Sequence, residues 1–182
     1  MNYLPPIVQI LLALMVATAA VYDIRYRRIP NRLVLGWLLL GIGLNIFLYE
    51  TPGLRSAGLG MGLALLIYFP LYLVRAMGAG DAKLMAAIGA IVGPGNWLGI
   101  FFISAFLGGA VAVGRLLGAG RLRHTVLNAV FILKQLTCFR APYAEREELD
   151  VNNPKAITLP HGAVVAGGAL AFLAAAAIWA PR

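Results

Sequence analysis

Charged residues are scarce in this 182-residue sequence. Only 12% of the residues are charged, whereas 61% are hydrophobic. A soluble globular domain has about 25% charged residues. The composition therefore excludes an ordinary soluble domain and favours an integral membrane protein, and the length predicts one domain over residues 1–182.

Cysteine, histidine and serine are also scarce. Cys138 is the only cysteine, so no internal disulfide can form, and with His124 and His161 as the only histidines the usual tetrahedral zinc site is not expected. We expect His161 to cap a helix start and His124 to face solvent or headgroups. The only serines, Ser56 and Ser104, lie in no G-x-S-x-G motif, which argues against a serine nucleophile. We therefore expect no metal and no cofactor.

Long apolar runs dominate the sequence and predict an all-α, polytopic membrane fold. Asn31 is expected to cap the second helix, the stretch from Glu50 to Gly53 to form a turn, and Trp97 to anchor the fifth helix at the membrane interface. The six predicted spans are residues 6–22, 33–49, 57–74, 82–92, 97–113 and 161–180.

Basic residues predict the topology of these spans. The first, third and fifth loops hold 13 of the 15 Lys and Arg residues, which places these loops in the cytoplasm and the N-terminus outside. Asp23 and Asp81 then lie on the cytoplasmic side of the cell inner membrane, and Glu50 lies on the opposite side. The net charge of +8 is explained by this topology and by anionic lipid headgroups, so no nucleic-acid partner is expected.

The polar interval 118–160 contains apolar residues at helical spacing among basic ones. This pattern predicts a basic amphipathic helix lying on the cytoplasmic membrane surface before the last span. An ordinary cytoplasmic helix packed on the bundle fits the pattern equally well. The repeating apolar residues are Leu122, Val126, Val130, Leu133 and Leu136.

Only three acids lie outside the acidic run at residues 145–150, namely Asp23, Glu50 and Asp81. A carboxylate at the edge of an apolar segment is costly, and it indicates a functional site. Asp81 precedes Pro94 by 13 residues, or about 20 Å of a core roughly 30 Å thick, so we expect Asp81 to be recessed at about the depth of Asp23.

Two such carboxyl groups held together share a proton. The ionised one can activate water while the other protonates the carbonyl under attack, which is the chemistry of aspartic proteases. Asp81 begins a predicted helix and Asp23 ends one, so the helix dipole predicts Asp81 as the base and Asp23 as the protonated partner. The alternative for Gly78-Ala79-Gly80-Asp81 is a flexible loop with Asp81 as an N-cap, and Gly118-Ala119-Gly120 shows that such tripeptides also arise by chance.

Two motifs together resemble the type IV prepilin peptidases, the GxGD membrane aspartic proteases. They are Asp23 with Ile29-Pro30-Asn31, and Gly78-Ala79-Gly80-Asp81-Ala82-Lys83-Leu84; Pro160-His161-Gly162 is similar to a weaker Pro-x-Gly feature. The resemblance implies that Asp23 and Asp81 are the catalytic pair, that Gly78 and Gly80 shape the loop, and that Lys83 lies nearby. It implies as substrate a type IV prepilin or pseudopilin, whose short basic leader is removed at the cytoplasmic face for pilus assembly or protein secretion.

Larger members of that family carry a Cys-rich segment between the first two spans, and here about ten residues connect them. The missing segment puts methylation of the mature pilin in doubt. The short form is similar to the peptidases of Tad-type Flp pilus systems or, less closely, to archaeal preflagellin peptidases, and the choice between them is left open. Two other functions fit a pair of acids: a small transporter or proton relay, and a non-catalytic subunit of a pilus or secretion machine. The oligomeric state is left open.

Overall fold

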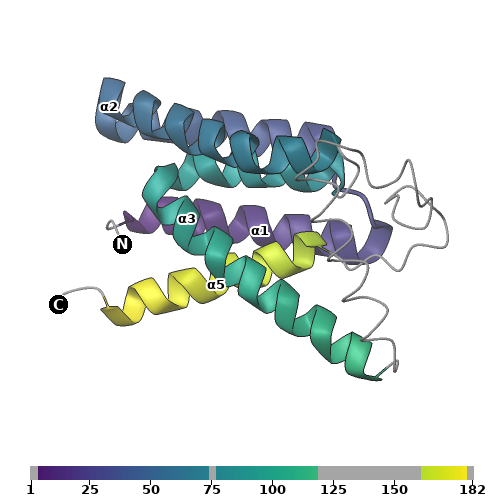
Figure 1. Cartoon of the computed structure of the whole chain (residues 1–182). Helices are drawn as coiled ribbons and strands as arrows, with labels where there is room; N and C mark the ends of the chain where they lie inside the picture. The colour runs from purple at the N-terminus through teal and green to yellow at the C-terminus, as the bar shows by residue number, and fades with distance from the viewer. Residues whose placement is uncertain (1–3, 74–76, 119–160, 180–182) are drawn as a thin grey trace.

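The computed structural model describes residues 4–73, 77–118 and 161–179, which form four α-helices and, within these ranges, no strand (Figure 1). All four are long and apolar enough to cross a membrane, so the prediction of an all-α membrane protein is confirmed. The predicted amphipathic helix within 118–160 lies outside the described residues. The helices are α1 (Pro6–Tyr26), α2 (Asn31–Leu73), α3 (Ala79–Gly118) and α5 (His161–Trp179).

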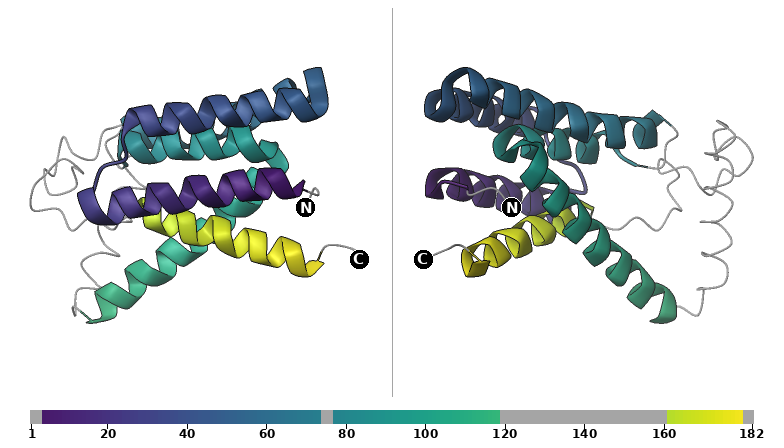
Figure 2. Two further views of the ribbon diagram at one scale, coloured as in Figure 1. Left: turned by 180° about the vertical axis from the view of Figure 1, so that it is seen from behind. Right: turned by 60° about the vertical axis from the view of Figure 1, so that its left-hand side comes forward.

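Helix α2 reverses direction at Glu50, whose backbone is not helical (φ 55°, ψ −132°). A Cβ at Gly53 would collide with the backbone carbonyl oxygen of Asn45, although residues eight apart in a straight helix are separated by about 12 Å. The two halves of α2 therefore fold back on each other and lie side by side (Figures 1 and 2). The predicted turn is confirmed, but the helix resumes at Thr51 rather than near residue 57.

Helix α3 is interrupted at Gly93, which has a φ of 74°. Glycine adopts this backbone conformation without steric cost, and Pro94 suits the first turn of the second half because no N–H is needed there. The second half runs obliquely and crosses α5 (Figure 1). The break expected over residues 93–96 is thus confined to Gly93.

The first half of α3 is the centre of the bundle. Residues 84–93 are all buried. Helix α2 makes the most extensive contact with α3, and Gly60 and Gly89 meet where the two helices pass so closely that a Cβ on either would collide with the other's carbonyl oxygen. Small residues at such a crossing let helix backbones approach in a membrane protein.

Buried amide and indole groups complete this centre. The Asn45 Nδ2 group donates to the carbonyl oxygens of Ala90 and Ile91, each at 3.0 Å, near the end of a helix segment where carbonyls lack intrahelical partners. Trp97 is fully buried, and its Nε1–H donates to the carbonyl of Met85 at 3.0 Å. The prediction of Trp97 as an interfacial anchor is therefore wrong, because its ring fills the core beside the break in α3 and its N–H has a protein partner.

Candidate active site

Three helix ends meet at one end of the bundle (Figure 1). Asp23 lies in the last turn of α1, Asp81 in the first turn of α3, and His161 is the first residue of α5. Helix α1 ends at Arg27, which has a left-handed backbone and donates its N–H to the carbonyl oxygen of Asp23 at 2.9 Å. This hydrogen bond caps α1 directly after the turn that carries Asp23.

The structure brings the two predicted aspartates together. Asp23 is only 8% exposed, and its Oδ2 accepts a hydrogen bond from the backbone N–H of Ala163 at 3.2 Å. Asp81 is half-buried and interacts electrostatically with both Asp23 and His161. Two carboxyl groups and an imidazole are therefore neighbours at the junction of α1, α3 and α5.

The position of Asp23 removes the basis for assigning acid and base by helix ends. That prediction treated Asp81 as the carboxyl at a helix N-terminus and Asp23 as the carboxyl at a C-terminus. The hydrogen bond from Ala163 places the Asp23 carboxyl at the N-terminus of α5. The Asp23 carboxyl thus lies near the C-terminus of α1 and the N-terminus of α5 at once, and the two helix dipoles act on it in opposite directions.

The two motif glycines place the start of α3 against the loop after α1. The carbonyl oxygen of Gly78 accepts the N–H of Asp81 at 3.2 Å, which begins the first turn of the helix. A Cβ at Gly80 would lie 4.0 Å from the Cβ of Ile29, and a Cβ at Gly162 would lie 3.1 Å from its Cδ1. The Ile29 side chain therefore lies between the starts of α3 and α5 and packs against the core.

Lys83 and Asn31 connect the starts of α3 and α2. The Nζ of Lys83 donates to Oδ1 of Asn31 at 3.0 Å on an exposed surface. The carbonyl of Pro30 accepts the N–H groups of Leu33 and Val34, and Asn31 is already the first helical residue. The prediction of Asn31 as an N-cap is therefore wrong, because its side chain bonds to Lys83 across the site.

The first turn of α5 contributes more than the sequence indicated. His161 does begin the helix, as expected, but its Nε2 is buried and has no hydrogen-bond partner within the described ranges. Sequence reasoning assigned His161 no catalytic role and missed the contacts of Gly162 and Ala163 with Asp23. The Pro160-His161-Gly162 motif was the only sequence signal for these contacts, and it did not indicate that they are made with Asp23.

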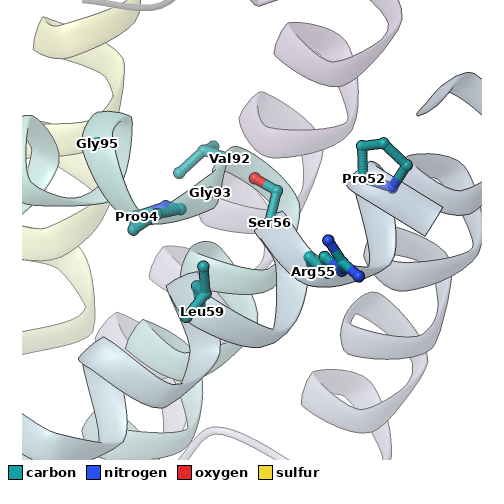
Figure 3. A pocket seen from close by; sticks show the side chains of 8 residues that line it. All are labelled: Pro52, Arg55, Ser56, Leu59, Val92, Gly93, Pro94 and Gly95. Atoms are coloured by element: carbon teal, nitrogen blue, oxygen red, sulfur yellow. The ribbon is translucent and has the colours of Figure 1, made fainter. Parts of the chain in front are cut away.

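A pocket lies at the other end of the first half of α3, where the two helix breaks meet (Figure 3). Val92 and Gly93 line it, and the hydroxyl of Ser56 lies close to Gly93. Asp81 precedes Gly93 by 12 residues, so about 18 Å of helix separates this pocket from the acids. No acid or histidine lines it, so the pocket is separate from the candidate aspartate pair.

Metal ligands do not cluster at the site as far as the structure describes the chain. No three His, Cys, Asp or Glu side chains in the described ranges are arranged to hold a metal ion. Cys138 and His124 lie outside these ranges. Cleavage without a metal stays a prediction.

A protein-family model matches a stretch of the chain that includes both aspartates. Residues 10–113 match the type IV leader peptidase family. These residues contain Asp23, the Ile29-Pro30-Asn31 motif and Asp81, whereas α5 lies beyond them. No curated protein and no solved structure matches the chain. A match over more than half of the sequence, together with the resemblance of the two motifs, shows that the chain belongs to the type IV leader peptidase family.

Proposed function

We propose that this protein is an aspartic endopeptidase that removes the short basic leader from type IV prepilins, with Flp-like prepilins as the expected class. The observation that carries the proposal is the meeting of Asp23 and Asp81 at one end of the bundle. Membership of a leader peptidase family supports proteolysis as the reaction.

The proposed mechanism uses the two carboxyl groups as an acid and a base. The ionised carboxylate takes a proton from water, and the resulting hydroxide attacks the carbonyl carbon of the scissile peptide bond. The protonated carboxyl group donates its proton to the carbonyl oxygen, which gives a tetrahedral gem-diol. The carboxyl group that took the proton from water then passes it to the leaving nitrogen, the other carboxylate takes a proton from the gem-diol, and the C–N bond breaks. Like-charge repulsion between neighbouring carboxylates supports a shared proton.

The proposed topology has six membrane crossings with the N-terminus outside and the aspartates at the cytoplasmic face of the inner membrane. The reversal at Glu50 and the break at Gly93 support the division of α2 and α3 into two crossings each. Prepilin and anionic lipid headgroups are the proposed partners.

A processing assay tests this proposal. Membranes containing the protein are incubated with a purified Flp-like prepilin, and the product is sized and its new N-terminus identified by mass spectrometry. We expect one cut between the basic leader and the hydrophobic helix, which persists in strong chelators and in the Cys138→Ala variant. Activity that is lost in chelator and restored by zinc would show that the proposed chemistry is wrong.

A further inference from the structure

The first turn of α5 lies directly against the carboxyl group of Asp23. The backbone N–H of Ala163 donates to Asp23 Oδ2 at 3.2 Å, across 140 positions of sequence. A Cβ at Gly162 would lie 3.0 Å from the same Oδ2 and 3.1 Å from the Cβ of Asp23. Distances of 3.0 to 3.4 Å are tighter than nine in ten real Cβ contacts, so a side chain at position 162 would displace the Asp23 and Ile29 side chains by a few tenths of an ångström.

We propose that Gly162 and the N–H of Ala163 are positioning groups that fix the Asp23 carboxyl for peptide cleavage. The inference rests on the proposed function of Asp23 and Asp81. It goes beyond the family match, which ends at residue 113 and does not include α5.

The physical reason lies in the free N–H groups of a helix start. The first N–H groups of an α-helix have no intrahelical acceptor, so the N–H of Ala163 is available to Asp23. A hydrogen bond to Oδ2 restricts rotation of the carboxyl group and thereby fixes the direction of Oδ1. Glycine at position 162 is what allows the Asp23 and Ile29 side chains to reach the backbone of α5.

A methyl group at position 162 should therefore displace the Asp23 carboxyl without removing it. Misplacement of a reacting group by about 1 Å lowers a rate by roughly 100-fold, so a displacement of a few tenths of an ångström should lower the kcat of Gly162→Ala by about 3- to 10-fold. The KM for prepilin should change by less than about twofold, because the change acts on the chemical step. Gly167→Ala on the same helix is the matched control, since nothing lies within 4 Å of its added Cβ.

A second pair of variants tests the hydrogen bond itself. Ala163→Pro removes the N–H at a position in the first turn of α5, where proline is tolerated, whereas Ala163→Ser keeps the N–H. We expect Ala163→Pro to lower kcat by at least about 10-fold and Ala163→Ser to stay near the wild-type rate. Thermal unfolding identifies any variant that has lost its fold, and if Gly162→Ala unfolds, the Ala163 pair decides.

The same assay on Asp23→Asn and Asp81→Asn separates the two hypotheses. If those variants are inactive while folded Gly162→Ala and Ala163→Pro retain the wild-type kcat, the aspartate pair stands and the positioning role of α5 is wrong. A loss carried entirely by KM would also overturn the positioning role. If the Asn variants still cleave prepilin, the proposed function itself is wrong.

Discussion

At the scale of residues, the candidate site is a pair of aspartates held where three helix ends meet (Figure 1). Acids are so scarce in this chain that Asp23 and Asp81 were nearly the only candidates, and the structure places them as neighbours. The sequence could not predict which aspartate is the acid and which is the base, because the hydrogen bond from Ala163 to Asp23 joins residues 140 positions apart. A contact of that range leaves no periodic signal in the sequence.

Lys83 and Asn31 give a residue-scale prediction. Their hydrogen bond joins the starts of α2 and α3 beside the site, and we expect it to contribute about 0.5 to 1 kcal/mol to alignment of the two helices. Lys83→Met and Asn31→Ala should each lower kcat/KM by roughly 2- to 5-fold, and the double variant should be little worse than either single variant. A double-mutant cycle on cleavage rates measures the coupling between Lys83 and Asn31. Fully additive losses in kcat/KM would show that their hydrogen bond does not contribute to cleavage.

At the scale of elements, helix type was predictable and helix boundaries were less so. Apolar runs and the turn residues after Tyr49 placed the reversal of α2 correctly. The short predicted loops at 50–53 and 93–96 became single non-helical residues, Glu50 and Gly93, since a helix regains its hydrogen bonds as soon as sterics permit. The predicted environment of Trp97 was wrong because an aromatic residue near a predicted helix end fits equally well at a lipid interface and in the protein core beside a helix break.

Both helix breaks should be more stable with glycine than with alanine, because both residues have a positive φ. Glu50 is held at a φ of 55° and Gly93 at 74°, a region that costs a residue with a Cβ about 1 to 3 kcal/mol. We expect Glu50→Gly to raise the free energy of unfolding relative to Glu50→Ala, and Gly93→Ala to lower it. Thermal unfolding in detergent measures both changes, and equal stability of the two Glu50 variants would contradict the strained geometry.

The crossing of α2 and α3 gives a second prediction at this scale. A Cβ on Gly60 would collide with the backbone of Gly89, so Gly60→Ala forces the helices apart and should destabilise the bundle by about 1 to 3 kcal/mol. Gly58→Ala and Gly62→Ala, where the added Cβ meets nothing within 4 Å, are the matched controls. If all three variants unfold at one temperature, α2 and α3 do not pack as described.

At the scale of the whole molecule, composition alone predicted a membrane-embedded helical bundle, and the structure agrees. The arrangement of helices was beyond the sequence, because nothing in the apolar runs distinguishes a central helix from a lipid-facing one. Residues 84–93 lie in the helix that makes the most extensive contact with α2, and Gly60 and Gly89 meet at that crossing.

The proposed six-crossing topology predicts which residues are reachable from each side of the membrane. In a Cys138→Ala background, Thr51→Cys should react with a membrane-impermeant maleimide added outside intact cells, and Tyr26→Cys should react only after the membrane is opened. Both positions are exposed and uncharged, so the substitutions leave the charge balance of the loops unchanged. Labelling of both from the same side would contradict the topology.

The most direct test of Asp23 and Asp81 as the catalytic pair is the cleavage rate of purified protein with a purified prepilin. The rate is compared between wild type, Asp23→Asn, Asp81→Asn and Glu50→Gln. Loss of an acid or base that acts in the transition state lowers a rate by about 100- to 10,000-fold. We therefore predict that both aspartate variants fold with the wild-type unfolding temperature but fall at least about 100-fold in kcat, whereas Glu50→Gln cleaves normally. Cleavage by either folded aspartate variant at a rate near that of the wild type would contradict the assignment of Asp23 and Asp81 as the catalytic pair.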